Sequence, residues 1–474
     1  MSKNLSADIC ILGAGSAGLS IAAGAAQMGA DTVLIEGGKM GGDCLNYGCV
    51  PSKSLLVAGK AAHFGQKAAQ FGIHYEAPKV DFQAVHDHVH GVIGAIAPHD
   101  SVERFEGLGV TVLQDYGRFT GPDEVIAGDT KVKARRFVVS TGSRAFIPPI
   151  PGLDQVSYLT NETVFDLTEL PEHLIVVGGG PIGCELGQAF RHLGAKVSLV
   201  EMFSIMPKDD PGLVDIVRQQ LVKDGLEIYE NTKVSGVSQT NGTIEVQIER
   251  GGAQEVIQGT ALLLAAGRTP NLDGLDLEKA QVEYHRGGIK TDQRLRSSNK
   301  KIFAAGDVAG GYQFTHMAGY HAGIVIRNAL FRLPAKVDNS AVPWVTFTDP
   351  ELAHVGLTEE QAKKSHGEVR ALEWSFDEND RAQAERDTRG RIKVTTRTNG
   401  KILGATIVGP HAGDLIQPWV LALSKGLKIG ALAGAIAPYP TMGEVSKRVA
   451  GSFYTEKLFS DRTKKIVRFL AKFG

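Results

Sequence analysis

The sequence predicts an α/β fold that contains two copies of a strand–helix–strand unit with a glycine-rich turn. The pattern Gly-x-Gly-x-x-Gly occurs twice, each time directly after a short apolar run. Each copy is followed about 20 residues later by a glutamate at the end of a second apolar run. A chain of 474 residues is too long for one hydrophobic core, so we expect roughly two to four domains.

The first unit begins with an apolar strand at 7–12 and continues through the turn into an alanine-rich helix that reaches about residue 30. A second strand at 32–35 leads to the acid. In a dinucleotide-binding βαβ unit the phosphates lie at the helix N-terminus and the acid holds a ribose hydroxyl. The residues predicted to bind this nucleotide are Gly13, Gly15, Gly18 and Glu36.

The second unit repeats this order, with strands at 174–177 and 196–200 and a helix between them that reaches about residue 193. Two complete Rossmann-like units imply two bound dinucleotides, the alternative being one functional unit and one glycine-rich relic. The residues predicted to bind the second nucleotide are Gly178, Gly180, Ile182, Gly183 and Glu201.

Glu201 also bears on which nicotinamide nucleotide is used. A carboxylate there accepts hydrogen bonds from the ribose hydroxyls of NAD and repels the 2′-phosphate of NADP. No arginine follows it in residues 202–207 to receive such a phosphate. We therefore favour NAD(H) over NADP(H).

The composition excludes several classes of protein. A net charge of −1 provides no field for nucleic acid. Four cysteines are too few for a secreted disulfide scaffold. Neither a signal-like segment before the first strand nor an apolar run of about 20 residues is found. We expect a cytoplasmic protein, in which a disulfide is usually catalytic or redox-sensing.

Two of the cysteines, Cys44 and Cys49, lie five residues apart with Gly48 between them. On a regular α-helix that step separates the Cα atoms by roughly 8–9 Å, beyond the ~7 Å at which two cysteines are bridged. A disulfide here requires a bent backbone, which Gly48 permits. Two unrelated buried cysteines are the alternative. Cys10 and Cys184 are expected to be small core residues.

Several segments together resemble the FAD-dependent pyridine nucleotide–disulfide oxidoreductases, the family of dihydrolipoamide dehydrogenase, glutathione reductase and mercuric reductase. The most specific segment is Gly-Gly-Asp-Cys-Leu-Asn-Tyr-Gly-Cys-Val-Pro-Ser-Lys at 41–53. Further matching segments lie at 140–143, 265–271, 302–307, 345–356 and 440–444. The resemblance covers nearly the whole chain.

The resemblance implies FAD in the first unit and NAD(P)H in the second, with a redox-active disulfide on the other face of the flavin. Cys49 would be the thiol beside the flavin, and Cys44 the exposed thiol that exchanges with substrate. Lys53 would lie by the flavin and pair with Glu185, whereas the residues alone suggest a solvated lysine and a first-turn acid. Further cofactor contacts are implied for Gly42, Asp43, Gly117, Thr141, Gly142, Ser143, Val234, Gly267, Asp307 and Thr315.

The sequence departs from this pattern at Tyr439. Dihydrolipoamide dehydrogenases and glutathione reductases have a histidine base here, which reaches the cysteines from the other subunit. Tyrosine, with an ordinary pKa near ~10, is a poor base at neutral pH. Glu444, which would orient that histidine, is expected only to accept a hydrogen bond from the phenol. A packing aromatic at a dimer interface is the alternative for Tyr439.

Mercuric reductases resemble this chain at Tyr439 and at segments 381–382 and 387–390. They also carry a C-terminal cysteine pair and an N-terminal metal-binding module, which this sequence lacks. Soft-metal capture needs thiols. The leading hypothesis is therefore a dihydrolipoamide dehydrogenase-like flavoenzyme acting on a disulfide, a dithiol or another thiol-reactive substrate. The alternatives are a mercuric reductase-like enzyme and a flavoprotein electron carrier for a protein or membrane partner.

We expect four regions. Residues 1–148 form the first part of the FAD domain, 149–272 the NAD(P) domain, 273–341 a central part that returns to the FAD, and 342–474 an α+β dimerisation domain of a homodimer. The basic amphipathic tail from Ser460 is expected to pack on its own dimer, with docking on a membrane or partner as the alternative. No metal site is expected, since His86, His88 and His90 are typical of a surface helix.

Overall fold

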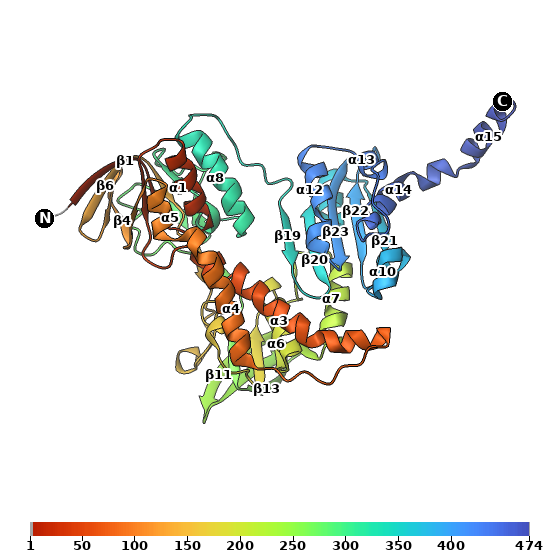
Figure 1. Ribbon diagram of the computed structural model, residues 1–474, viewed down its shortest axis with the longest axis horizontal. Coiled ribbons are helices and arrows are strands. Elements are labelled where there is room, and N and C mark those ends of the chain that lie inside the picture. Colours follow the sequence, from red (N-terminus) through yellow and green to blue (C-terminus); the bar gives the residue numbers. More distant parts are fainter. Residues whose placement is uncertain (1–2, 474) are drawn as a thin grey trace.

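The computed structural model describes residues 3–473, and in it the chain forms three bodies, each around its own sheet (Figure 1). Two of these sheets are mainly parallel and carry helices, and the third is antiparallel. The predicted α/β class is confirmed. In the described part of the chain, no helix is long and apolar enough to cross a membrane.

The first body contains a seven-stranded sheet. Its strands in spatial order are β3 (Val110–Leu113), β2 (Thr32–Ile35), β1 (Lys3–Leu12), β6 (Thr130–Val139), β5 (Glu124–Ala127) and β4 (Gly117–Gly121), and β18 (Ile302–Ala304) also pairs with β6. The second half of β1, from Ile9 to Leu12, is at most 2% exposed. A continuous apolar run of this kind is typical of a parallel strand covered on both faces.

The helices of the first body include a pair that packs on this sheet, α1 (Ser16–Gln27) and α8 (Thr315–Ala329). The first helix is three residues shorter than predicted, because Gly29 takes a φ of +85° just after it. The others are α2 (Gly42–Asn46), α3 (Cys49–Ala68), α4 (Phe82–Ile96) and α5 (Val102–Gly107).

The second body repeats the βαβ arrangement of the first. Its parallel sheet has the order β10 (Leu226–Tyr229), β9 (Lys196–Val200), β8 (His173–Val177) and β14 (Ala261–Leu264). Helices α6 (Pro181–Leu193) and α7 (Pro211–Lys223) accompany it. An antiparallel sheet is formed by β11 (Thr232–Thr240), β12 (Thr243–Arg250) and β13 (Ala253–Gly259). The strands and helix predicted for the second unit are confirmed within one residue.

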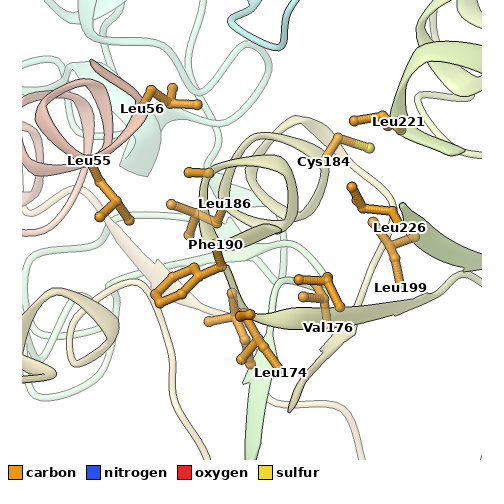
Figure 2. Close-up of a cluster of buried hydrophobic side chains, with 14 of the residues drawn as sticks. Leu55, Leu56, Leu174, Val176, Cys184, Leu186, Phe190, Leu199, Leu221 and Leu226 are labelled. Carbon is orange, nitrogen blue, oxygen red and sulfur yellow. The ribbon is translucent and has the colours of Figure 1, made fainter. Parts of the chain in front are cut away.

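Helix α3 joins the first two bodies. Leu55 and Leu56 of α3 belong to the same buried cluster as Leu186 and Phe190 of α6, as Figure 2 shows. Because α3 begins at Cys49, this packing ties the position of that cysteine to the helix that follows the second glycine-rich turn.

The third body is an antiparallel sheet covered by helices. Its strands in spatial order are β19 (Pro343–Thr346), β20 (Glu351–Gly356), β23 (Ile402–Gly409), β22 (Arg391–Thr396) and β21 (Arg370–Ser375). Its helices are α9 (Glu359–His366), α10 (Asp380–Glu385), α11 (Ala412–Leu415), α12 (Gln417–Ser424), α13 (Ile429–Ala433) and α14 (Glu444–Leu458). The last helix, α15 (Asp461–Leu470), projects away from this body (Figure 1).

Two strand pairings bring distant segments together. β7 (Ser143–Ala145) pairs with β15 (Arg268–Pro270), and β18 completes the first sheet with residues from late in the chain. Between β14 and β18 the chain also forms a small hairpin of β16 (Tyr284–His285) and β17 (Gly288–Ile289). The short helix η5 (Gly306–Ala309) follows β18 and leads toward α8. The exact boundaries of the four predicted regions stay predictions.

Candidate active site

The backbone between the two predicted redox cysteines is bent, as the sequence analysis requires. Cys44 lies in α2, which ends at Asn46, and Cys49 is the first residue of α3. A Cβ atom at Gly48 would lie 3.0 Å from the backbone oxygen of Asp43, closer than ordinary packing allows. Glycine at this position therefore lets the short helix α2 meet the start of α3, with the two thiols on the same side of the bend.

Both thiols are free, and each shifts the pKa of the other. Hydrogen bonding with Cys44 lowers the pKa of Cys49 to about 6, with further lowering from Thr315 and from the charge of Lys53. The Thr315 hydroxyl oxygen lies 3.3 Å from the Cys49 sulfur. The same interaction with Cys49 raises the pKa of Cys44. Cys49 is therefore the thiol that ionises first in the reduced pair.

The exposure of the two cysteine residues differs from the expectation. Cys49 is exposed in this chain and Cys44 is half-buried, although Cys44 was expected to be the exposed thiol. Cys44 belongs to α2, which packs against α3 and α4, whereas Cys49 stands at the first turn of α3. The roles assigned to the two thiols by resemblance stay predictions.

Lys53 and Glu185 form the predicted ion pair, with 2.8 Å between the lysine Nζ and a carboxylate oxygen. Glu185 is only 4% exposed. Its other oxygen accepts a hydrogen bond of 2.9 Å from the backbone N–H of Phe347, and Lys53 lies over the Phe347 ring. The pair therefore joins α3, α6 and the third body next to the cysteines, and a buried carboxylate of this kind needs such partners.

Arg268 connects three of the predicted cofactor residues. Its guanidinium lies 2.9 Å from a carboxylate oxygen of Asp43 and donates to the Ser143 hydroxyl at 2.8 Å. Ser143 in turn donates to Asp307 at 2.5 Å, and burial raises the pKa of Asp307. The sequence analysis missed Arg268 as a site residue, although it follows Gly267 in a matching segment. Its signal was a cation directly after the glycine of that segment.

Asn161 is a second site residue that the sequence analysis missed. Its side-chain amide donates to the Asp43 carboxylate at 2.9 Å and to the backbone oxygen of Tyr47 at 3.2 Å. It is buried in a loop far from the cysteines in sequence, and no motif surrounds it. Only the fold brings this amide to the bend between the two thiols.

The two glycine-rich turns share one geometry, and this geometry fits a dinucleotide. The first glycine of each turn, Gly13 or Gly178, has a φ above +100°. A Cβ on the third glycine, Gly18 or Gly183, would come within 2 Å of the oxygen of the first. The middle glycine of the second turn has open space around it, and that of the first meets only the Gly42 Cα atom, at 3.9 Å. The first and third glycines are closely packed, and the backbone of the middle glycine is free for a ligand to approach. This arrangement suits a pyrophosphate group.

The acids of the two units also occupy equivalent positions. Glu36 accepts a hydrogen bond from the backbone N–H of Ala14 at 2.5 Å, and Glu201 accepts one from Gly179 at 2.6 Å. Each acid therefore faces its own glycine-rich turn from the end of the second strand. Met202 and Phe203, which follow Glu201, are exposed apolar residues. No cation therefore stands in the chain directly after the second acid.

The remaining predicted cofactor residues lie along these turns or at strand ends. The Thr141 hydroxyl donates to the Asn271 backbone oxygen at 2.7 Å. Gly142 and Gly267 have φ values of +68° and +120°. Gly42 stands beside Gly15, Ile182 in the first turn of α6, Gly117 at the start of β4 and Val234 in β11. Their cofactor contacts stay predictions.

Tyr439 lies on the surface of the third body and is 68% exposed. Its hydroxyl donates a hydrogen bond of 2.9 Å to Asp380, and this bond raises the pKa of Tyr439 further above its ordinary value. The expected acceptor was Glu444, and that expectation is wrong. Glu444 is the first residue of α14 and pairs with Arg448 one turn later, at 2.8 Å.

A histidine cluster that the sequence analysis missed lies where α3 meets α6. The rings of His63 and His192 are stacked with centroids 4.1 Å apart, and His192 lies 3.0 Å from Asp224. The Asp224 oxygens also accept hydrogen bonds from Gln188 and Gln220. Because these donors already engage the carboxylate, the cluster serves as a polar anchor between the two helices. His86 and His90 lie on one face of α4, as predicted.

Two dinucleotide-binding turns and one interacting pair of thiols together define a two-nucleotide oxidoreductase with a dithiol centre. Residues 7–322 match the family described as pyridine nucleotide-disulphide oxidoreductase, and residues 342–450 match its dimerisation domain. The chain belongs to this family, whose members bind FAD and use NAD(P)H.

The relatives fall into the two groups that the sequence analysis named. A mercuric reductase of Bacillus cereus is 36% identical over 453 residues, which cover 95% of this chain and 72% of the relative. A dihydrolipoyl dehydrogenase of Geobacillus stearothermophilus is 34% identical over 449 residues, covering 93% and 94%.

Solved structures that resemble this fold include a flavoprotein disulfide reductase. The HOCl-induced flavoprotein disulfide reductase RclA of Escherichia coli superimposes with a TM-score of 0.83 at 27% identity, covering 94% of this chain and 99% of that one. LpdA of Mycobacterium tuberculosis gives a TM-score of 0.86 at 25% identity, covering 95% and 99%.

Proposed function

We propose that this protein passes electrons from NAD(P)H through FAD to the Cys44–Cys49 pair, which then reduces a disulfide or another thiol-reactive acceptor. The observation that carries the proposal is the bend between α2 and α3, which brings the free thiols of Cys44 and Cys49 close enough for each to shift the pKa of the other. FAD, when bound, supplies the two-electron chemistry that links a hydride donor to a dithiol. The Lys53–Glu185 pair fixes the first turn of α3 and holds a positive charge near Cys49.

The acceptor chemistry follows from the two sulfurs. A thiolate attacks a disulfide sulfur and forms a mixed disulfide, and the second thiol of the pair displaces the reduced substrate thiol. The enzyme pair is then a disulfide, and two electrons from NAD(P)H restore it. A dihydrolipoamide dehydrogenase-like enzyme catalyses the same thiol–disulfide exchange in either direction.

The test is an anaerobic titration of the FAD-loaded enzyme with NADH. In the wild type, two electrons should generate a long-wavelength absorption band from the Cys49 thiolate beside the flavin. The variant Cys49→Ser should lack this band and lose disulfide reductase activity. Cys10→Ala, which changes a buried thiol outside the site, is the control and should retain both. If Cys49→Ser gave the wild-type spectrum, the pair would not lie in the electron path.

A second candidate is a mercuric reductase-like enzyme, favoured by a tyrosine at position 439 where dithiol-specific members have histidine. Cys10 and Cys184 are buried, so among the described residues only the Cys44–Cys49 pair is available to a soft metal ion. Steady-state NADH oxidation with lipoamide, Hg(II), quinones and protein disulfides as acceptors separates the candidates. A kcat/KM for Hg(II) above that for every disulfide would favour this second candidate.

We also propose that NADH is the preferred donor, because Glu201 faces the second glycine-rich turn and exposed apolar residues follow it. Glu201→Gln should lower the NADH-to-NADPH ratio of kcat/KM by roughly tenfold. The variant loses one charge-assisted hydrogen bond to NADH and the repulsion of the NADPH phosphate. Glu36→Gln is the matched control, because it makes the same change in the first unit. Measured on FAD-loaded enzyme, it should leave the ratio unchanged, and an equal effect of both variants would refute the assignment.

A further inference from the structure

Helix α15 does not pack against the rest of the described chain. None of the residues from Asp461 to Leu470 is buried, and the helix points away from the third body (Figure 1). Its start is well defined, because the Ser460 hydroxyl caps it by accepting from the Thr463 backbone N–H at 3.3 Å. A capped helix of ten residues with both faces open needs an occupant for its apolar face.

One side of α15 is a continuous apolar stripe. Ile466 and Leu470 lie four residues apart on α15 with Phe469 beside them, and Phe473 follows three residues after the helix ends. Their exposed fractions run from 48% for Ile466 to 74% for Phe473. Isolated apolar side chains on a surface are ordinary, but a stripe of large ones on a projecting helix marks an interaction site.

The other side of α15 is basic, with Lys464, Lys465, Arg468 and Lys472 all exposed. Among the described residues, only Lys464 of these four has an acidic partner, Asp461 at 3.5 Å. The whole chain has a net charge of −1, so this concentration of positive charge is local. Unpaired cations beside an apolar stripe complement a surface that combines negative charge with an apolar layer.

The packing of the third body ends before α15 begins. The buried residues of α14 are Val445, Ser446, Val449 and Ala450, and the match to the dimerisation domain also ends at residue 450. A helix packed on a second copy would need acidic groups there to meet its cations. A lipid surface supplies both negative charge and an apolar layer. Helix α15 projects away from the third body (Figure 1).

We propose that α15 docks this enzyme on an anionic lipid bilayer. Ile466, Phe469, Leu470 and Phe473 enter the boundary between headgroups and acyl chains, and the flanking lysine and arginine side chains reach the anionic headgroups. The helix lies in the plane of the surface and does not span it. The dithiol centre stays in water, attached to the surface through α14.

The experiment is vesicle flotation with the full-length, FAD-loaded protein. Vesicles of phosphatidylcholine alone are compared with vesicles that contain phosphatidylglycerol, at low and high salt. The wild type should float with the anionic vesicles and be released by salt. Phe469→Asp with Leu470→Asp should abolish flotation, and Lys465→Glu with Arg468→Glu should weaken it at least roughly tenfold, since each basic residue near an anionic surface contributes severalfold.

The matched control for charge is Lys79→Glu with Lys364→Glu, which reverses two exposed lysines elsewhere and should float as the wild type does. All variants should keep the wild-type NADH-dependent reduction of a soluble disulfide, which shows that the fold is intact. The proposal is overturned if the wild type stays with the unbound fraction. It is also overturned if the α15 variants float as the wild type does. A third contrary outcome is a wild type that does not bind vesicles together with a change of oligomeric mass when residues 460–474 are deleted.

Discussion

Cys49 is the residue at which the contacts of the site converge. Cys44 is its hydrogen-bonding partner, the Thr315 hydroxyl lies 3.3 Å away and Lys53 adds a positive charge from one helical turn further along α3. Each of these contacts favours the charged form of the sulfur. Together they place its ionisation below neutral pH, although partial desolvation of the sulfur acts in the opposite direction.

The first prediction concerns the pH dependence of this thiolate. Because the pKa of Cys49 is lowered to about 6, the long-wavelength band of the two-electron reduced enzyme should persist above that pH and fade below it. Thr315→Val removes a hydrogen bond to the sulfur and should move the midpoint upward, whereas Thr315→Ser keeps the hydroxyl and should not. An unchanged midpoint in Thr315→Val would show that this contact does not tune Cys49.

The second prediction concerns Tyr439. Its pKa is raised by Asp380, so even less of the phenolate form that could act as a base is present at neutral pH than in a free tyrosine. Tyr439→His should raise the rate of dihydrolipoamide oxidation by roughly tenfold or more, since a positioned general base typically contributes at least that. Tyr439→Phe is the control and should give no gain. Equal rates in all three proteins would mean that a missing base does not limit dithiol oxidation.

Among the secondary-structure elements, α3 contacts all three bodies of the molecule. It starts at Cys49, packs on α6 through Leu55 and Leu56, and reaches the third body through Lys67, which pairs with Asp349. Burial alone would raise the pKa of Asp349, but the charges of Arg389 and Lys67 outweigh it and lower the pKa to about 2. Arg389 lies 3.0 Å from the carboxylate. A single, partly buried acid therefore links the helix that begins at Cys49 to the third body.

The third prediction follows from this acid. A carboxyl whose folded pKa lies below its unfolded value stabilises the fold above about pH 4, and that stabilisation is lost as the pH falls toward 2. The shift corresponds to roughly 2 kcal/mol. Asp349→Asn should lower the melting temperature at pH 7 by about 3 °C or more. The same change at exposed Asp377 should leave it within error, and the Asp349 difference should shrink below pH 4.

At the scale of the whole molecule, the third body presents the surface next to Tyr439 to solvent. Ile436, three residues before Tyr439, is 96% exposed. A large apolar side chain that is fully exposed in a dimerisation domain indicates a contact with a second copy. In such a dimer Tyr439 would lie at the interface, which is where the resemblance places the base of dithiol-specific members.

The fourth prediction tests this arrangement. Ile436→Asp should shift the protein from dimer to monomer in light scattering and should lower disulfide reductase activity. Reduction of the flavin by NADH should continue, because both nucleotide turns lie within one chain. Ile73→Asp is the control, since Ile73 is also an exposed apolar residue but lies outside the third body. A dimer that survives Ile436→Asp would exclude this surface as the main contact.

The predictable part of the site is local in sequence. The glycine-rich turns, their acids and the bend at Gly48 follow from backbone geometry within a few residues, and the structure contains all of them. Arg268 and Asn161 could not be found this way, because Arg268 meets Asp43 across more than 200 residues and Asn161 carries no motif. The resemblance to the family suggested Glu444 as the acceptor of the Tyr439 hydroxyl, but the hydroxyl donates to Asp380, which comes from another helix.

By itself, the sequence determined the two βαβ units, the resemblance to one family and the residue types available for dithiol chemistry, because these depend on short-range backbone rules and on composition. Only the tertiary structure decided which thiol has the lowered pKa, which charges surround it and which surfaces remain uncovered. The physical reason is that pKa values and exposure are set by neighbours in space. Around Cys49 those neighbours come from α2, α3 and α8, and around Glu185 from α3 and the third body.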